Sequence, residues 1–271
     1  MQQPETLTVT DDLGRKLNVP AQPQRVMALA PSMTEMLFAV CDTATIVART
    51  QNCNHPKAAL AKPVVNNYPM DYEQLLLQKP DIVFTVDGIT PQDVAARLEE
   101  LGVPVYYQKY ETLDDIFTGL EEIGKIMDRE QQAKQLTDSL RKELQQLQAQ
   151  PKPATAPTVL AITWPDPIHV YGKNTLLTEK LKLIGAENAM QEDLQNPYPP
   201  VTREYVLKLN PDVILGQSFE KMDENFFSLY PELKQIKAYQ TKQIYEPTDD
   251  LMSRPSPRVV ESVKELQELI F

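Results

Sequence analysis

The chain has 271 residues, 42% hydrophobic and 24% charged, which allows a sizeable core in one large domain or two small ones. Its 27 basic and 38 acidic residues give a net charge of -11, which argues against nucleic acid, or an anionic membrane surface held by charge alone, as a partner. No apolar stretch approaches the roughly 20 residues of a membrane-spanning helix. With two histidines and no CxxC motif, a three-imidazole metal site and a zinc knuckle are also excluded.

The amino-terminal residues 1–5 have neither the basic nor the apolar segment of a signal peptide. Two interpretations stay open: a cytosolic protein, or a mature exported protein numbered after its leader was removed. Cys41 and Cys53 could pair in an oxidising compartment, but two cysteines are too few for a disulfide framework.

The first elements in chain order are a hairpin, a strand and a helix. Residues 7–10 and 16–19 flank a glycine-containing turn and predict a β-hairpin. An apolar strand over 25–29 follows and runs into Ser32, which with Glu35 three residues later forms a capping box that predicts a helix start.

The same strand and helix alternation continues downstream. We expect helices over 71–78 and 91–101, and strands over 81–86 and 103–107. This alternation predicts an α/β fold with a parallel sheet covered by helices on both faces.

Residues 128–150 differ in character from the rest of the chain. Gln, Lys, Glu, Arg and Leu dominate there, glycine and proline are absent, and four leucines recur at helical spacing: Leu136, Leu140, Leu144 and Leu147. We predict one long helix ended by Pro151, after which a strand over 158–162 begins the pattern again.

An internal repeat flanks this helix. Residues 71–84 resemble residues 202–215: each has a capping residue, a short helix with an acid at its second position, a Pro-Asp pair and an apolar strand. A chance recurrence of a common pattern is the alternative. The repeat favours two Rossmann-like lobes, 1–127 and 151–271, joined by the rigid helix 128–150, with a ligand cleft between the carboxyl ends of their strands.

No sequence motif of an enzyme is present: GxGxxG, Walker A, GxSxG and HExxH are all missing. An acid–base enzyme using Asp249, Asp250 and His169 is one rival hypothesis, and a sensor or scaffold domain on the same fold is another. Aromatic side chains just after strands, or in loops leading to helices, suit a large, partly polar ligand. Each one alone fits a half-buried surface residue equally well, but as a set they favour a ligand. They are Tyr68, Tyr107, Trp164, Tyr171 and Tyr198.

Several segments, in order along nearly the whole chain, resemble the class III periplasmic substrate-binding proteins of ABC importers for cobalamin, ferric siderophores and haem. The segments are 10–15 (TDDLGR), 23–26 (PQRV), 30–35 (APSMTE), 78–83 (QKPDIV), 101–105 (LGVPV), 184–188 (IGAEN) and 254–259 (RPSPRV). The resemblance implies two Rossmann-like lobes bridged by a rigid helix. It also implies an exported protein, periplasmic or lipid-anchored, whose leader is absent from this sequence.

In this family a glutamate on each lobe docks onto arginines of the permease dimer. Glu73 and Glu204 match these positions, and they are also the acids that coincide in the internal repeat. Alternatively, each glutamate is present because an acid near a helix N-terminus interacts favourably with the macrodipole, which contributes about 0.3–1 kcal/mol. This role is compatible with docking.

Among the family's members, the chain is most similar to the cobalamin binders. The loop 49–56, and Asp250 with Arg254, resemble theirs, where the Asp and Arg bond the polar edge of the corrinoid. Tyr198 matches a cleft tryptophan. Other cleft rings of the family are not matched. A second cleft tryptophan corresponds to Asn67 or Tyr68, a third to Val86 or Asp87, and a loop tyrosine to Asn52.

These departures keep a different corrinoid, a ferric siderophore and haem open as ligands. Haem would need an axial ligand, for which Tyr68, Tyr198 or His55 are candidates. A siderophore would favour arginines, and Arg49 and Arg254 are available.

The predicted protein is a monomer that captures cobalamin and has no catalytic residue, no resident cofactor and no metal site. The predicted ligand-binding residues are Ser32, Met33, Asn52, Asn67, Tyr68, Asp87, Trp164, His169, Tyr171, Tyr198, Asp250 and Arg254.

Overall fold

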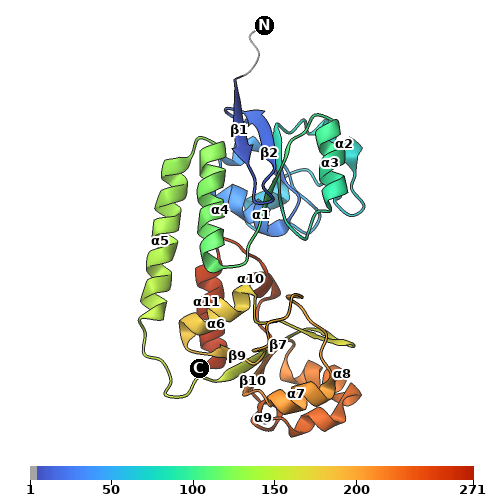
Figure 1. The fold of residues 1–271 in the computed structure, drawn as a ribbon, viewed down its shortest axis with the longest axis vertical. Helices are drawn as coiled ribbons and strands as arrows, with labels where there is room; N and C mark the ends of the chain where they lie inside the picture. Colours follow the sequence, from blue (N-terminus) through green and yellow to red (C-terminus); the bar gives the residue numbers. More distant parts are fainter. Residues whose placement is uncertain (1–4) are drawn as a thin grey trace. The chain divides into compact units, whose positions relative to one another are not determined.

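The structure is a computed structural model that describes residues 5–271, and it divides into two compact units (Figure 1). Unit 1 comprises the chain as far as Tyr110, then Asp114–Leu140 and Arg254–Pro257. Unit 2 comprises Glu111–Leu113, Arg141–Ser253 and Arg258–Phe271.

Unit 1 contains a parallel sheet of four strands in the order β4-β3-β5-β6. The strands are β3 (Val26–Ala28), β4 (Ile46–Ala48), β5 (Ile82–Val86) and β6 (Val105–Gln108). Helices α2 (Tyr72–Leu77) and α3 (Gln92–Glu100) pack on one face through Leu75, Ala95 and Leu98. The predicted parallel α/β sheet of this half is therefore confirmed.

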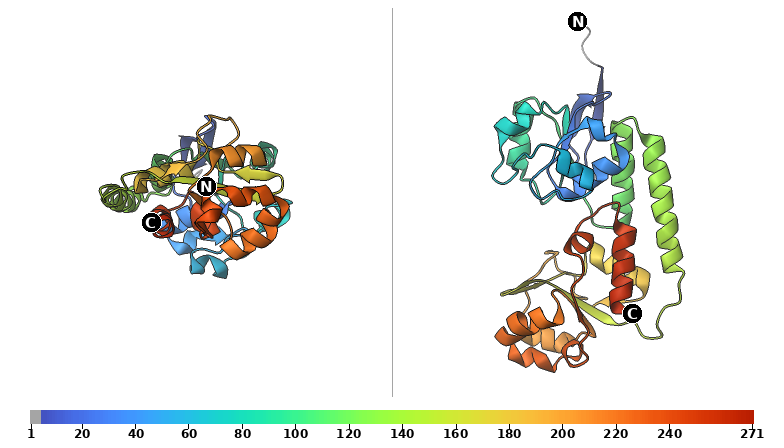
Figure 2. Two further views of the ribbon diagram at one scale, coloured as in Figure 1. Left: turned by 90° about the horizontal axis from the view of Figure 1, so that it is seen from below. Right: turned by 180° about the vertical axis from the view of Figure 1, so that it is seen from behind.

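The opposite face of this sheet meets α4 (Leu113–Ile126), a helix that the sequence analysis did not anticipate. Successive residues of a strand point to opposite faces. Tyr107 accordingly belongs to the α2–α3 side, whereas Tyr106 and Gln108 reach α4, where Gln108 Nε2 donates to the carbonyl of Gly119 at 2.9 Å. Helix α4 lies beside the following helix α5 (Glu130–Gln148) in both figures (Figures 1 and 2), and Thr137 Oγ1 donates to Glu121 Oε1 at 2.8 Å between them.

The predicted helix at Ser32 begins earlier than expected. Helix α1 (Pro31–Val40) has proline in its first turn and Ala30 at its N-cap, without a side-chain cap. Proline pre-sets the helical φ and has no N–H to satisfy, so it starts the helix and displaces the capping box. Ser32 and Glu35 lie inside the helix, where both are buried.

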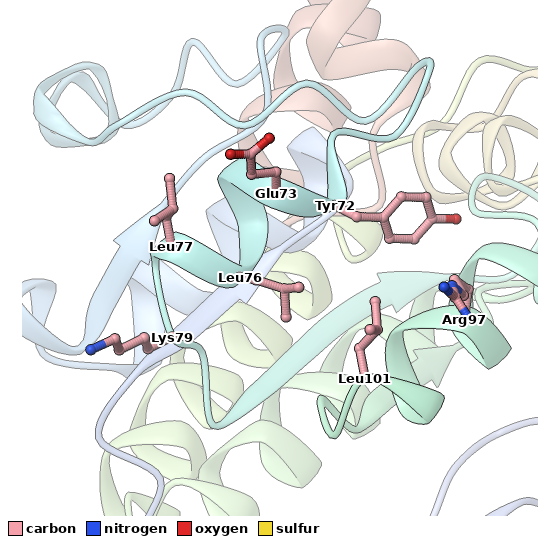
Figure 3. Close-up of a pocket in the computed structure, with 7 residues that line it drawn as sticks. All are labelled: Tyr72, Glu73, Leu76, Leu77, Lys79, Arg97 and Leu101. Carbon is pink, nitrogen blue, oxygen red and sulfur yellow. The ribbon is translucent and has the colours of Figure 1, made fainter.

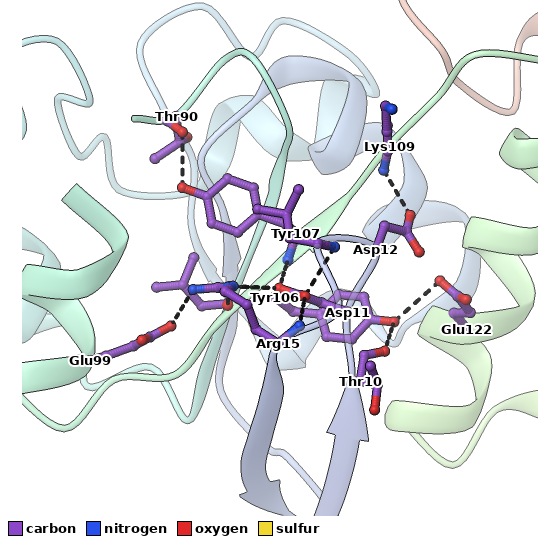
Figure 4. A network of polar contacts seen from close by, with 12 residues as sticks. Thr10, Asp11, Asp12, Arg15, Thr90, Glu99, Tyr106, Tyr107, Lys109 and Glu122 are labelled. Carbon is purple, nitrogen blue, oxygen red and sulfur yellow. Dashed lines mark hydrogen bonds and ion pairs between the residues drawn. The ribbon is translucent and has the colours of Figure 1, made fainter. Parts of the chain in front are cut away.

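The predicted hairpin is confirmed as strands β1 (Thr6–Thr10) and β2 (Lys16–Pro20), and a polar network ties its turn to the sheet (Figure 4). Arg15 donates to Asp11 Oδ2 at 2.7 Å, to the carbonyl of Val105 at 2.6 Å and to Glu99 at 2.9 Å. Gly14 in the turn has a φ of +76°, a conformation that glycine adopts without strain. The 10–15 segment therefore has a structural role in unit 1.

Unit 2 contains a sheet in the order β11-β10-β7-β8, with β9 also paired to β7. Its strands are β7 (Thr158–Pro165), β8 (Ile168–Val170), β9 (Glu187–Asn188), β10 (Val213–Leu215) and β11 (Ile244–Tyr245). β8 is antiparallel to β7, and the other pairings are parallel. Because β8 returns along β7, it brings residues 168–170 beside the carboxyl half of β7.

Helices pack on this second sheet as well. Three helices and one 3₁₀ segment, Pro231–Gln235, cover one face through Val206, Phe226 and Ala238. The helices are α7 (Arg203–Leu209), α8 (Phe219–Leu229) and α9 (Lys237–Gln240). Helices α6 (Leu176–Ile184) and α11 (Val259–Ile270) contact each other, and α10 (Asp249–Ser253) precedes α11. The remaining 3₁₀ segments are Thr43–Thr45 and Lys57–Ala61 in unit 1.

The internal repeat has the same local structure in both units. Asp71 caps α2 by accepting from the amide of Gln74, and Thr202 caps α7 by accepting from the amide of Tyr205. After each helix a residue with positive φ, Lys79 or Asn210, reverses the chain into Pro-Asp.

The aspartate of each Pro-Asp pair then accepts from a backbone amide at the start of a central strand. Asp81 Oδ2 accepts from the amide of Arg25 at 2.8 Å, and Asp212 Oδ2 accepts from the amide of Thr158 at 2.8 Å. The two copies of the predicted repeat therefore share these hydrogen bonds as well as their sequence pattern.

The predicted helix over 128–150 corresponds to α5, within two residues at each end. The division between the two units falls inside this helix, after Leu140. The ligand cleft expected between the lobes stays a prediction.

Candidate ligand-binding and docking sites

Several predicted ligand-binding residues lie where the strands of unit 1 end. The carboxyl ends of parallel strands meet at one edge of a sheet, where α/β folds bind ligands. Asp87 follows β5 directly, and the loop from Arg49 to Asn54 follows β4. Asn67 joins them because its Nδ2 donates at 2.8 Å to the carbonyl of Leu29, just after β3. Three loops are therefore positioned at one edge.

Arg254 belongs to unit 1 and lies against one of these loops. Its Nη1 donates to Glu35 Oε1 at 2.9 Å and to Asn54 Oδ1 at 2.7 Å, and its Nη2 lies 3.4 Å from the carbonyl of Asn52. The side chain of Arg254 is 12% exposed and that of Glu35 only 2%. The structure therefore brings two predicted site residues, Asn52 and Arg254, into direct contact, and the same arginine pairs with Glu35, which the sequence pattern had assigned to a helix cap.

The other predicted residues of unit 1 differ in exposure. Tyr68 is 87% exposed, so its ring is available to a ligand, whereas Ser32 and Met33 are buried in α1 at 2% and 0%. Arg49 donates to the carbonyls of Thr50, Gln51 and Cys53 in its own loop, which gives it a structural role there.

Both cysteines are buried free thiols. The sulfur of Cys53 lies 3.0 Å from Thr50 Oγ1 and 3.1 Å from Thr34 Oγ1, so it helps to pack this loop onto α1.

An aromatic pair lies at the β8 side of unit 2. The rings of Tyr171 and Tyr198 meet edge to face with centroids 5.2 Å apart, a favourable arrangement for aromatic rings. Burial raises the pKa of both phenols, so both stay neutral and offer apolar faces with a hydroxyl end. Tyr198 is 44% exposed and Tyr171 only 6%, so Tyr171 supports the ring that a ligand can reach.

Trp164 and His169 face each other across strands β7 and β8. The Trp164 indole N–H donates to the carbonyl of Asp166 at 2.9 Å, which fixes the ring while leaving 59% of the residue exposed. His169 Nδ1 lies 2.9 Å from the carbonyl of Pro167, which orients the imidazole locally. An indole held at its edge and exposed on its face suits stacking on a planar ligand.

A buried lysine that the sequence analysis did not single out supports the helix carrying Asp250. Lys180 on α6 is fully buried, and its ammonium donates to the carbonyls of Leu251 and Met252 in α10 at 3.0 and 3.1 Å. Burial lowers the pKa of this ammonium to about 7. Lysine is rarely buried unless paired, but no sequence pattern around residue 180 distinguishes it from a surface lysine.

The two predicted docking acids occupy equivalent positions, each at the second residue of its helix. Both are exposed, but their surroundings differ. Arg203 Nε bonds Glu204 Oε1 at 3.0 Å and Glu232 Oε1 at 3.1 Å. The pKa of Glu204 is lowered by a hydrogen bond from its own backbone amide and then by Arg203. Glu73 has no ion pair within residues 5–271.

The described part of the chain contains no group of three His, Cys, Asp or Glu side chains arranged to hold a metal ion. The acids of the rival enzyme hypothesis, Asp249 and Asp250, occupy the first turn of α10, while His169 is oriented by its own loop. No helix within residues 5–271 is long and apolar enough to cross a membrane.

Comparison with known proteins identifies the class. The profile of the periplasmic binding protein family matches residues 26–251, and the chain therefore belongs to this family. It is a substrate-binding protein of the ABC-importer type, a class of transport proteins.

Two relatives match over nearly the whole chain. An uncharacterised ABC transporter substrate-binding lipoprotein, YvrC of Bacillus subtilis, is 27% identical, covering 98% of this chain and 85% of its own. A vitamin B12-binding protein of Vibrio parahaemolyticus is 24% identical, covering 90% and 88%.

Solved structures share the fold. A Staphylococcus epidermidis protein, described as a possible iron-binding (periplasmic solute-binding) protein, superposes with a TM-score of 0.83 at 26% identity, covering 92% of this chain and 99% of its own. A periplasmic haem-binding protein of Pseudomonas aeruginosa has a TM-score of 0.79 at 21% identity, covering 92% and 93%. The expected α/β fold with parallel sheets is confirmed.

Proposed function

We propose that this protein captures a corrinoid, with cobalamin as the first candidate, and delivers it to the permease of an ABC importer. The observation that carries the proposal is the set of anchored, exposed rings in unit 2. Trp164 and Tyr198 are 59% and 44% exposed, yet each is held in place by a bond or a ring contact. Pre-positioned rings bind a large ring-containing ligand without losing much side-chain entropy.

Polar groups of both units would bond the rim of this ligand. Arg254, Asn52 and Asp87 at the sheet edge of unit 1, and Asp250 on α10 of unit 2, carry donors and acceptors suited to amide side chains. The relative that is named as a vitamin B12-binding protein supports this choice.

A second candidate is a haem or ferric siderophore binder with the same transport role. It is favoured by the exposure of Tyr68, 87%, since a free phenol could ligate haem iron. The structural likeness to iron- and haem-binding proteins is compatible with it.

The site of action that fits this proposal is outside the cytoplasm, in the periplasm or tethered to the cell envelope. The lipoprotein relative and the name of the family support it. The partner would be a permease dimer, contacted through Glu73 and Glu204, and the protein would act as a monomer without a resident cofactor.

Calorimetric titration with cyanocobalamin, haem and a ferric siderophore in parallel tests the ligand assignment. We expect one-to-one binding of cyanocobalamin that Tyr198→Ala weakens by about tenfold, the low end for removing a buried aromatic contact. Tyr198→Phe, which keeps the ring, is the matched control and should bind within about twofold of wild type.

Binding of haem alone, abolished by Tyr68→Phe, would replace the corrinoid with haem. Conversion of any bound ligand to a product, abolished by Asp250→Asn, would replace the transport role with the enzyme hypothesis.

A further inference from the structure

A hollow in unit 1 lies directly beside one of the two predicted docking acids. It has a volume of about 500 Å³ and lies between α2 and the end of α3 (Figure 3). Its lining residues are Tyr72, Glu73, Leu76, Leu77, Lys79, Arg97 and Leu101. In Figure 3 the side chains of Leu76 and Leu101 point toward each other from the two helices.

Two leucines among the residues that line the hollow are exposed to solvent. Leu77 is 61% exposed and Leu101 is 39% exposed, and both line the hollow together with Tyr72. Contiguous exposed apolar residues with a polar rim mark interaction sites more often than scattered ones do.

The charges around this hollow define the complementary partner. Glu73 is the one carboxylate among the described lining residues, and no ion pair neutralises it within residues 5–271. Arg97, on the opposite wall, is already paired to Glu100 at 2.7 Å. Lys79 is a second cationic residue of the lining. A partner that fills the hollow therefore needs a cationic side chain near Glu73 but not near Lys79, and an apolar side chain between them.

The internal repeat shows that this surface is not duplicated. Aligning the two helices by their caps places Glu73 opposite Glu204 and Leu77 opposite Lys208. In unit 2 the ammonium of Lys208 lies over the ring of Tyr205 at 5.8 Å, and Arg203 holds Glu204. The leucine that extends the apolar wall in unit 1 is thus a charged residue in unit 2.

We infer that the hollow between α2 and α3 is an apolar anchor site for the permease, in which one permease subunit inserts a leucine- or phenylalanine-sized side chain beside the basic group that pairs with Glu73. The inference rests on the proposed transport function and adds an asymmetry to it. Unit 1 docks by charge and apolar contact, whereas unit 2 docks by charge after Arg203 releases Glu204.

The test measures association of the ligand-loaded protein with the cobalamin permease–ATPase complex of the same organism, held in nanodiscs. Leu77→Lys introduces the residue of unit 2, and we expect it to weaken association by about tenfold or more, the effect of losing one buried leucine. Leu229→Lys, at the similarly exposed Leu229 (54%) on α8, is the matched control and should associate like wild type.

Three further outcomes separate this inference from the proposed function. If Glu73→Gln weakens association but Leu77→Lys does not, docking stands and the anchor site is refuted. If wild type does not associate at all, the proposed function fails and the anchor site fails with it. If Leu77→Lys instead converts a dimer of this chain into a monomer by light scattering, the occupant is a second copy and the inference is overturned.

Discussion

The pair formed by Arg254 and Glu35 gives the sharpest stability prediction. Arg254→Met removes the guanidinium but keeps an apolar stem of similar length. It removes one charged partner of the Glu35 carboxylate, which is 2% exposed inside α1. Breaking a buried pair by removing one partner costs about 3–5 kcal/mol. Because Arg254 itself is 12% exposed, we expect a loss at the lower end, about 3 kcal/mol.

The double variant Glu35→Gln, Arg254→Met is the control for this reasoning. It also removes the negative charge of Glu35, so it should recover more than half of the stability that Arg254→Met loses. The coupling energy from this double-mutant cycle separates the ion pair from the packing of the arginine stem.

Urea denaturation followed by two probes measures the effect in the right unit. Trp164, the single tryptophan of the chain, belongs to unit 2, whereas Glu35 and Arg254 belong to unit 1. The circular dichroism transition should therefore shift more than the Trp164 fluorescence transition. A single variant within about 0.5 kcal/mol of wild type, or a double variant no more stable than the single one, would refute the reasoning.

Three further predictions follow from other contacts. Below pH 7, Lys180 is protonated in both the folded and the unfolded chain, and burying its charge destabilises the folded state. Between its folded pKa of about 7 and the ordinary value of 10.5, Lys180 is neutral in the folded chain and protonated in the unfolded chain. The free energy of unfolding should therefore rise with pH in that window, by up to about 1.4 kcal/mol per pH unit relative to Lys180→Met, and a difference independent of pH in urea titrations would contradict this. Glu204→Gln should weaken permease association less than Glu73→Gln does, because Arg203 already pairs with Glu204. Arg203→Ala should therefore tighten the contact that Glu204 makes with the permease. Equal losses for Glu204→Gln and Glu73→Gln in biolayer interferometry would show that Arg203 does not compete with the permease for Glu204. Asp81→Asn and Asp212→Asn should each cost about 1–3 kcal/mol in thermal or urea unfolding, because each weakens charge-assisted bonds at the start of a central strand. A silent variant would disprove the repeat's structural role.

Local sequence signals predicted most of the elements because each rests on nearby residues. The hairpin turn, the caps at Asp71 and Thr202, and the Pro-Asp pairs all depend on residues within a few positions of each other. The helix start at Ser32 was wrong for the same kind of reason: two local signals competed, and the proline preceding the serine prevailed.

The candidate site was less accessible to sequence reasoning because its contacts join distant positions. Arg254 reaches Glu35 across 219 residues, and Lys180 supports α10 from 71 residues away. Helix α4 was also missed, although Thr112 and Asp115 form the Thr-x-x-Asp pattern that typically precedes the apolar run of a helix. The ligand-binding and docking assignments remain predictions that rest on the family resemblance and on exposure.

Transport in proteoliposomes tests the central claim most directly. The cobalamin permease–ATPase complex would be reconstituted with labelled cyanocobalamin outside, with this protein added or omitted. We predict ATP-dependent uptake that needs the protein and is lost in the Glu73→Gln, Glu204→Gln double variant, whose calorimetric affinity for the ligand is unchanged. Uptake that does not respond to the protein, although the protein binds cyanocobalamin, would contradict its assignment as the capturing component of this importer.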